Sequence, residues 1–250
     1  MKIKIYCSAV LLVFAAVINC DNVLPKNPLE EQILSLLNKW RNGPVQTNLF
    51  PLPNLKSISI NGIQSSYEGR GIKIVFSIGD MKLTGMNNFS VEKIDVISTA
   101  NSLDIYAKIS IPILLLHAEK YELRGRAYYV YPLKGSGQMK VLLLNNKVAL
   151  SVRFVYVDDI LTSIQDFSLK YNIGNIEANL ENSSWPISNV LNSEGVKILE
   201  NYHDDINNAL RDYAVPYANE FLAKIKPKQF LDTIADISLN SYVIEENDTF

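Results

Sequence analysis

Few residues of this chain have the type and spacing that catalysis requires. The only two histidines in the sequence, His117 and His203, have neither the spacing of a zinc site nor that of a serine–histidine pair. The range Asp158–Asp159 follows a predicted strand, where a solvated turn is a simpler interpretation than an acid–base couple. Gly135–Gly137 lies between strands and lacks the spacing of a nucleophile elbow. The sequence therefore predicts a protein that is not an enzyme and has no metal or cofactor.

Alternation of apolar and polar residues predicts a large antiparallel sheet. Every odd position from 103 to 115 is apolar, and the even positions 104 to 110 are polar. Because successive side chains of a strand point to opposite faces, this run predicts one long strand with one buried face. His117 continues the odd set and is expected at a satisfied or rim position. Shorter runs with the same period cover 72–78, 148–156 and 167–173.

Turn-forming residues suggest where this sheet changes direction. Asn145-Asn146 predicts a hairpin turn between strands 139–144 and 147–157. Gly79-Asp80 predicts a turn after the strand at 72–78. Strands as long as 103–115 are expected in a strongly curved sheet.

Apolar residues that recur every three or four positions predict one long amphipathic helix from Val196 to Ile225. Asn192 or Ser193 is a suitable N-cap, and His203 is expected on the solvent side of the apolar stripe. Pro216 removes one backbone hydrogen bond and predicts a kink near 210–212, which would let the helix follow a curved sheet.

A second, shorter helix is expected near the N-terminus. Asn27 and Pro28 form a typical helix start, and the helix should end near Gly43. Its apolar face comprises Leu29, Ile33, Leu36, Leu37 and Trp40.

The length of 250 residues and the absence of a linker-like stretch predict a single domain at 21–250. Lysines precede an apolar run at 5–18, which is too short to cross a membrane, so 1–20 is predicted to be a secretory signal. Three acceptor sequons for N-glycosylation, at Asn88, Asn182 and Asn247, agree with an extracellular location. The net charge is −2 with both signs interspersed, which predicts neither nucleic acid nor a polybasic face for anionic membranes.

Several short motifs, in order, resemble the insect takeout and haemolymph juvenile-hormone-binding family. Tyr121–Gly125 followed by Tyr131–Gly137 is similar to the hairpin of that family, and Leu169–Gly174 followed by Leu180–Asn182 is similar to a later strand and turn. Val190–Asn192, Ile206-Asn207 and the Pro216 step match its closing segment. No single motif is diagnostic, but their order and spacing cover about Leu24 to Leu231.

The resemblance implies an α+β fold in which a long helix is wrapped by a highly curved antiparallel sheet. Such a lipid-binding super-roll resembles one lobe of bactericidal/permeability-increasing protein and contains a hydrophobic tunnel. Family members usually carry two N-terminal cysteines that form a disulfide, and the segment Leu24–Leu29 has neither. The N-terminal arm is therefore expected to be untethered.

Candidate ligand-binding residues follow from periodicity, since the family offers no short signature to transfer. Helix residues should face sheet residues, and each of them is about as compatible with ordinary core as with a tunnel wall. Buried tyrosines would offer a hydroxyl to an ester, ketone or epoxide oxygen. The candidates are Ile74, Phe76, Phe154 and Tyr156 on the sheet, and Ile206, Leu210, Tyr213, Tyr217 and Phe221 on the helix.

Two classes of function remain open from the sequence. The first is a secreted carrier of a small hydrophobic ligand, such as a juvenile-hormone-like terpenoid, a fatty acid or a related lipid. The alternative is an extracellular interaction or immune-recognition protein of the same fold with a filled core, similar to the mite group 7 allergens. Neither class requires a catalytic residue.

Overall fold

The computed structural model describes residues 23–43, 45, 54–69, 71–128, 130–157, 161–223 and 225–239. The predicted signal at 1–20, the range Asp158–Asp159 and the sequon at Asn247 lie outside these residues.

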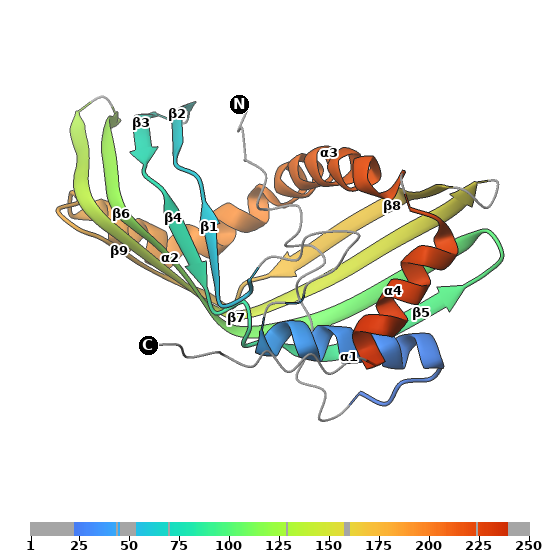
Figure 1. Ribbon diagram of the computed structural model, residues 1–250. Coiled ribbons are helices and arrows are strands. Elements are labelled where there is room, and N and C mark those ends of the chain that lie inside the picture. Colours follow the sequence, from blue (N-terminus) through green and yellow to red (C-terminus); the bar gives the residue numbers. More distant parts are fainter. Residues whose placement is uncertain are drawn as a thin grey trace, which may run out of the picture.

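The described strands form one antiparallel sheet, as the alternating pattern predicts. Two very long strands run the length of the molecule, and most of the shorter strands pair with one half or the other of these two (Figure 1). The exceptions are the first two strands, which pair with the fourth and the third strand. The strands are β1 (Ser57–Ile60), β2 (Ile63–Gly69), β3 (Ile72–Ile78), β4 (Met81–Thr84), β5 (Ser90–Ser98), β6 (Ser102–Ala127), β7 (Tyr131–Val157), β8 (Leu161–Asn172) and β9 (Asn175–Leu180).

Strands β6 and β7 pair along nearly their whole length and divide the sheet into two halves. In one half, β5 pairs with the beginning of β6 and β8 pairs with the end of β7. In the other half, β3 and β4 pair with the later part of β6, and β9 pairs with β7. Gly79-Asp80 is not a turn, because β3 and β4 continue along the same partner strand on either side of it.

The predicted hairpin at Asn145-Asn146 is wrong, because β7 runs through both residues without reversing. Asn145 has a positive φ of 55°, and the buried side-chain amide of Asn146 donates to the carbonyls of Ile111 and Leu143 at 3.0 and 2.8 Å. The neighbour of β7 changes here from β8 to β9. Asparagine tolerates the left-handed conformation that the local distortion requires, and the same property made the pair resemble a hairpin turn.

The buried face of β6 changes at the same level of the sheet. Odd positions are buried or half-buried as far as Ile111, but Ile113 is 50% exposed and Ala118 is fully buried. Because side chains alternate between the two faces, the two halves of the sheet bury opposite faces of this strand. The expectation of one buried face from 103 to 115 is therefore wrong beyond Ile111.

Two helices occupy the range of the single predicted helix at 196–225, and a third follows it. They are α2 (Pro186–Asn201) and α3 (His203–Leu222), separated by a break at Tyr202, and then α4 (Pro227–Leu239). Pro216 lies inside α3 and does not end it. Asn192 is not an N-cap but a residue within α2, where its side-chain oxygen accepts a hydrogen bond from the Ala178 amide of β9 at 2.5 Å.

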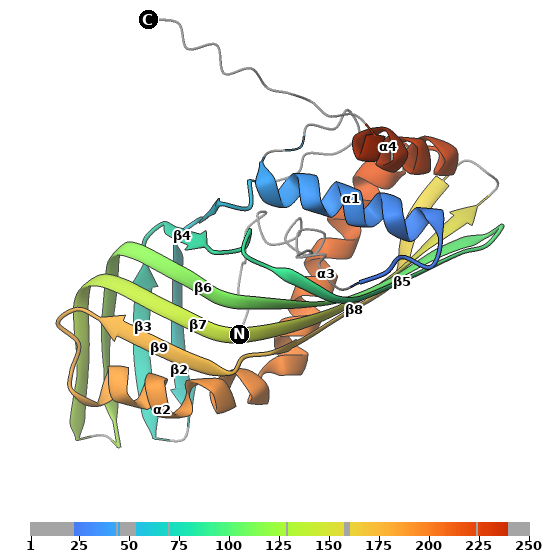
Figure 2. The same ribbon diagram turned by 90° about the horizontal axis from the view of Figure 1, so that it is seen from below.

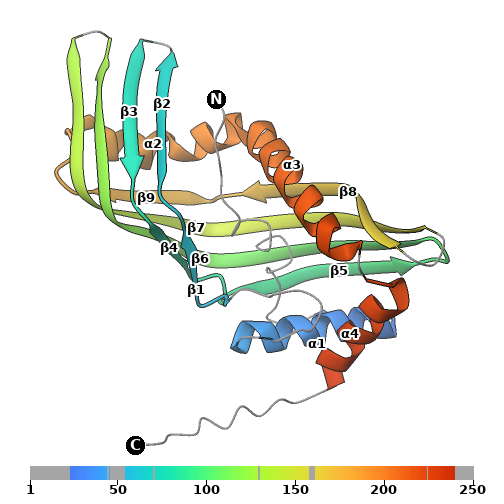
Figure 3. The ribbon, with the colours of Figure 1, turned by 45° about the horizontal axis from the view of Figure 1, so that its top comes forward.

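Each helix covers a different part of the sheet. Helix α2 contacts β9, and α3 contacts β8. Helix α1 (Pro28–Asn42) contacts β5 and packs against α4 (Figure 2). Figure 3 shows α2 and α3 following one another along β9 and β8, at the side of the sheet away from α1. No helix among the described residues is long and apolar enough to span a membrane.

The start of α1 agrees with the sequence prediction and also attaches the N-terminal segment. Asn27 caps the helix by accepting from the Glu30 amide at 2.9 Å, and Pro28 occupies the first turn. The buried Glu30 carboxylate accepts from the backbone amide of Val96 on β5 at 3.1 Å. Lys26 forms an ion pair with Asp95 at 2.6 Å. The segment is therefore held to the edge of β5 by polar contacts, which corrects the expectation of an untethered arm.

Candidate hydrophobic ligand site

Two apolar clusters line the inside of the molecule. The large cluster lies where α1, α3 and α4 face β5 to β8, and the rings of Phe154 and Phe230 pack there with centroids 5.4 Å apart. The small cluster lies beneath α2, and Ile60 packs against both clusters. Fully buried members of the large cluster include Trp40, Leu55, Phe89, Leu103, Ile109, Ile111 and Phe154. The small cluster comprises Met81, Ala118, Tyr121, Met139, Ala178 and Leu180.

Three tyrosines bring hydroxyl groups into these apolar surroundings. Burial is the main cause that raises the pKa of Tyr121, Tyr156 and Tyr171, so each remains a neutral hydroxyl. Tyr121 donates to the Glu181 carbonyl at 2.7 Å, and Tyr171 donates to the Leu199 carbonyl at 3.0 Å.

The hydroxyl of Tyr156 is different, because it is buried and no described residue is its hydrogen-bond partner. The Tyr156 side chain packs against the large cluster, beside β8. An unpaired buried hydroxyl costs about 1–3 kcal/mol, so a site that retains one is suited to a ligand that completes the bond.

A second unpaired polar atom lies on the same strand. The side-chain oxygen of Asn146 is buried without a partner, although its amide nitrogen is bonded to two carbonyls. Asn146 and Tyr156 are both even-numbered residues of β7, in the half where even positions point to the large cluster. At about 3.3 Å per residue, roughly 30 Å of strand separates them. The interior thus has sparse polar groups spread along its length.

The structure brings only some of the predicted ligand-binding residues together. Phe154 and Tyr156 lie in or against the large cluster, near one end of β7. Ile74 and Phe76 lie on β3, paired with Gly125 and Leu123 near the other end of the sheet. The remaining candidates are on α3, and their side chains are outside the described part of the structure: Ile206, Leu210, Tyr213, Tyr217 and Phe221.

Neither histidine forms a catalytic arrangement. His117 has a buried Nε2 without a partner and lies between Lys82 and Lys140 on the neighbouring strands. Its Nδ1 is 3.8 Å from the Glu119 carboxylate. Among the described residues, no group of three or more histidine, cysteine, aspartate or glutamate side chains is placed to hold a metal ion.

His203 departs from its expected position on the solvent side of the helix. It begins α3, and its half-buried ring packs on Tyr171 of β8 with centroids 4.6 Å apart. Because the helix is broken at Tyr202, the side chain of His203, which a continuous helix would expose to solvent, faces β8.

The motifs at 121–137 and 180–182 meet in space, although each is weak as a sequence signal. A Cβ at Gly135 would overlap the Tyr121 hydroxyl, and the Tyr121 hydroxyl bonds the Glu181 carbonyl. Gly137 has a positive φ of 134°, and a Cβ there would meet the Glu181 side chain at 2.5 Å. The Glu181 carboxylate also accepts from the Gln138 amide at 2.9 Å. The glycines are therefore needed where a tyrosine and a glutamate from distant segments approach the backbone.

Comparison with known proteins places this geometry in a family. The family model of the haemolymph juvenile hormone binding protein (JHBP) matches residues 15–232, which is most of the chain. The chain therefore belongs to the haemolymph juvenile hormone binding protein family. No curated protein sequence matches the chain.

One solved structure shows the same fold. The crystal structure of Takeout 1 from Epiphyas postvittana is similar with a TM-score of 0.53 at 16% identity, and the match covers 76% of this chain and 88% of that one. A structure of lipopolysaccharide binding protein matches with a TM-score of 0.37 at 8% identity, covering 80% of this chain and 38% of that one. The first match confirms the α+β fold with a long antiparallel sheet and covering helices.

Family membership also confirms two functional expectations at a coarse level. The family consists of binding proteins and not enzymes, and its members carry hydrophobic ligands. It is named for proteins of the haemolymph, an extracellular fluid.

Proposed function

We propose that this chain is a secreted carrier that encloses a small, elongated, mostly apolar ligand with an oxygen acceptor. The unpaired Tyr156 hydroxyl supports this most directly, because it lies against the large cluster and offers a single donor. A terpenoid ester or epoxide of the juvenile-hormone type, a fatty acid or a related lipid has the matching chemistry.

The expected affinity follows from burial with one hydrogen bond. Burying about 300 Å² of apolar ligand surface contributes about 7 kcal/mol at about 25 cal/mol per Å². One hydrogen bond adds about 1 kcal/mol, which together corresponds to a Kd in the micromolar range. The oxygen acceptor of the ligand contributes little to the affinity. It orients the ligand, because only the end that carries the acceptor can bond Tyr156.

Displacement of an apolar fluorescent probe tests the proposal. The probe should bind stoichiometrically, and a terpenoid ester should displace it more strongly than a hydrocarbon of the same length. Native mass spectrometry of protein purified from its own source would identify a copurified ligand. If the probe shows no saturable binding and no lipid copurifies, the carrier function is excluded and the alternative of a filled core with a recognition surface takes its place.

Secretion is part of the same proposal. The first 20 residues are proposed to be removed as a signal, leaving a mature domain at 21–250 that carries N-linked glycan. Asn88 and Asn182 are both exposed, so both can accept glycan in the folded protein.

A further inference from the structure

One end of the sheet extends beyond the helices that cover the rest of it. We call this part of the sheet the projecting end. It consists of β2, β3, the part of β6 from Tyr121 to Ala127 and the part of β7 from Tyr131 to Gly137 (Figures 1 and 3). Its inner face carries Ile74, Phe76 and Leu123, which are half-buried, and Leu123 packs against the small cluster.

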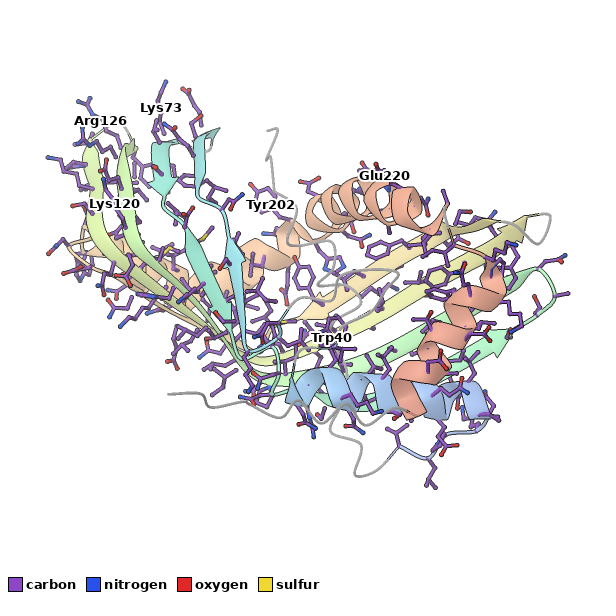
Figure 4. All side chains as sticks on the ribbon, in the orientation of Figure 1. Trp40, Lys73, Lys120, Arg126, Tyr202 and Glu220 are labelled. Atoms are coloured by element: carbon purple, nitrogen blue, oxygen red, sulfur yellow. The ribbon has the colours of Figure 1, made fainter. Side chains whose placement is uncertain are left out.

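The outer face of the projecting end gathers cations. The register places Lys73 opposite Arg126, Val75 opposite Arg124, and Arg124 opposite Lys134. Residues directly opposite one another in an antiparallel sheet share a face, so these side chains form one patch. Figure 4 shows Lys73 and Arg126 projecting from this same end.

Most cations of this patch lack the acidic partners that several other cations of the sheet have, and the ion pair that Glu122 of the projecting end forms is with Lys120. In the other half, Arg153 faces Asp104 at 2.5 Å, and Lys108 pairs with Glu92 at 2.7 Å. In the patch, only Lys73 has such a partner, Glu68 at 2.9 Å, and both of these side chains are well exposed. Arg124, Arg126 and Lys134 form no ion pair with any described residue.

Like charges directly opposite one another destabilise a sheet. Two such pairs, Lys73 with Arg126 and Arg124 with Lys134, therefore lower the stability of the projecting end in isolation. An anionic partner on this face would turn the repulsion into attraction. Val75, between the cations, is exposed and adds an apolar contact.

Aromatic residues border the patch. Residues 181–184 follow the free edge of β7, where the Ser184 amide donates to the Lys134 carbonyl at 2.7 Å, and the next residue is Trp185. Trp185 is 84% exposed, and Tyr128 and Tyr131 at the tip of the hairpin are also exposed. Tryptophan and tyrosine favour the interface between lipid headgroups and hydrocarbon, and lysine and arginine favour anionic headgroups.

We propose that the projecting end docks on anionic phospholipid membranes, with Arg124, Arg126 and Lys134 at the headgroups and Trp185 in the interface. A soluble polyanion would match the charges but would give Trp185 and the tyrosines no apolar environment, so the membrane is favoured. The net charge of −2 conceals the patch, because its cations are spread over three strands in the sequence. The clustering of these cations differs from the sequence-based expectation of interspersed charges without a polybasic face.

The test measures binding of the intact protein, expressed in insect cells and treated with glycosidase, to vesicles of phosphatidylcholine with and without phosphatidylserine. The treatment removes any glycan on Asn182, whose side chain bonds the Ser136 carbonyl beside the patch. Trp185 reports insertion directly, because the other tryptophan, Trp40, is only 2% exposed and belongs to the core. Binding should require phosphatidylserine, weaken with salt, and shift tryptophan emission to the blue. The shift should disappear in Trp185→Phe.

A charge variant and a matched control identify the surface. Removing three cations in Arg124→Gln/Arg126→Gln/Lys134→Gln should weaken vesicle binding on the order of 100-fold, from about fivefold for each charge. The control Lys56→Gln/Lys170→Gln/Lys226→Gln removes the same charge from exposed positions away from the projecting end, and it should bind as the wild type does.

Three results would each overturn the proposal. The first is that the protein does not bind phosphatidylserine vesicles, and the second is that both triple variants lose the same vesicle affinity. The third is that the protein binds vesicles without a blue shift of tryptophan emission and binds heparin with the same salt sensitivity. The last result would identify a soluble polyanion as the partner. Circular dichroism confirms folding of each variant, and probe binding measured separately keeps failure of docking distinct from failure of the carrier function.

Discussion

At the scale of single residues, the partners of the buried hydroxyls decide what each tyrosine contributes. Tyr121 and Tyr171 bond backbone carbonyls of distant segments and so stabilise the fold. Burial also raises the pKa of Tyr156, but no described residue bonds its hydroxyl, which is therefore available to a ligand. The same residue type therefore serves two purposes within one interior.

Tyr156→Phe should separate ligand binding from stability. Removing an unpaired hydroxyl should leave the thermal midpoint of the ligand-free protein unchanged or raised. Affinity for an oxygenated terpenoid should fall about 5- to 10-fold, for one lost hydrogen bond of about 1–1.5 kcal/mol. Tyr171→Phe is the matched control and should lose about 1 kcal/mol of stability with affinity unchanged. Equal behaviour of the two variants in both assays would contradict the assigned role.

Gly135→Ala should destabilise the contact between the hairpin and the turn after β9. A methyl group there overlaps the Tyr121 ring, and overpacking of this kind costs about 1–3 kcal/mol. Tyr121→Phe in the same chain should recover part of that loss, because the closest overlap is with the hydroxyl. Urea unfolding of the two single variants and the double variant measures the coupling, and strictly additive losses would argue against a direct contact.

At the scale of elements, the edge of β5 is protected by the start of α1. An unpaired sheet edge is a template for association with another chain, and here Glu30 and Asn27 bond the amide and the carbonyl of Val96. Helix α1, which the sequence predicts, thus also covers the edge of β5, which the sequence does not identify as an edge.

Glu30→Ala should open this edge. Loss of the buried acceptor leaves the Val96 amide unpaired, which should cost about 1–3 kcal/mol and accelerate hydrogen exchange of that amide. Glu31→Ala, on the exposed side of the same helical turn, serves as the control and should leave exchange in β5 unchanged. Unaltered exchange in Glu30→Ala would show that α1 does not hold the edge.

Acid should weaken the same element. Hydrogen bonding from Lys26 and Lys93 lowers the pKa of Asp95, and hydrogen bonding from Lys108 lowers the pKa of Glu92. A carboxylate with a lowered pKa stabilises the folded state above its unfolded pKa of about 4 and loses that effect as the pH falls through the folded value. The thermal midpoint of Asp95→Asn should therefore lie below that of the wild type at pH 7, and the difference should shrink as the pH falls below the unfolded pKa of about 4. A constant difference at all pH values would contradict this linkage.

At the scale of the whole molecule, the sheet has one enclosed half beneath the helices and one projecting end with its own surface chemistry. The enclosed half provides the apolar interior, and the projecting end gathers unpaired cations and exposed aromatic residues. A carrier with both features could take up or release an apolar ligand at a membrane surface.

Secretion of the intact chain is the simplest prediction at this scale. Expressed in insect cells, the protein should reach the medium without about the first 20 residues and with glycan on at least one sequon. Mass spectrometry before and after glycosidase treatment measures both. Asn182→Gln should remove the largest share of the glycan, because Asn182 is exposed in the turn after β9. An intracellular product that retains Met1 would contradict the prediction.

The sequence by itself determined the elements whose periods are local. Alternation defined β3, most of the β6 pattern and β8, and the cap at Asn27 defined α1, because these signals depend on neighbouring residues only. The order of short motifs also indicated the family that the comparison confirms. The ligand-binding positions were predicted from the same periodicity. Periodicity identifies the apolar face of one helix or strand, but it does not tell which faces of different elements pack together.

Only the tertiary structure decided where those faces lie. It extended β7 through Asn145-Asn146, reversed the buried face of β6 after Ile111, and divided the predicted helix into two at Tyr202. It also placed Ile74 and Phe76 far along the sheet from Phe154 and Tyr156, and aligned Arg124 with Lys134. The physical reason is that register and curvature arise from contacts between distant segments, so a local pattern cannot specify them.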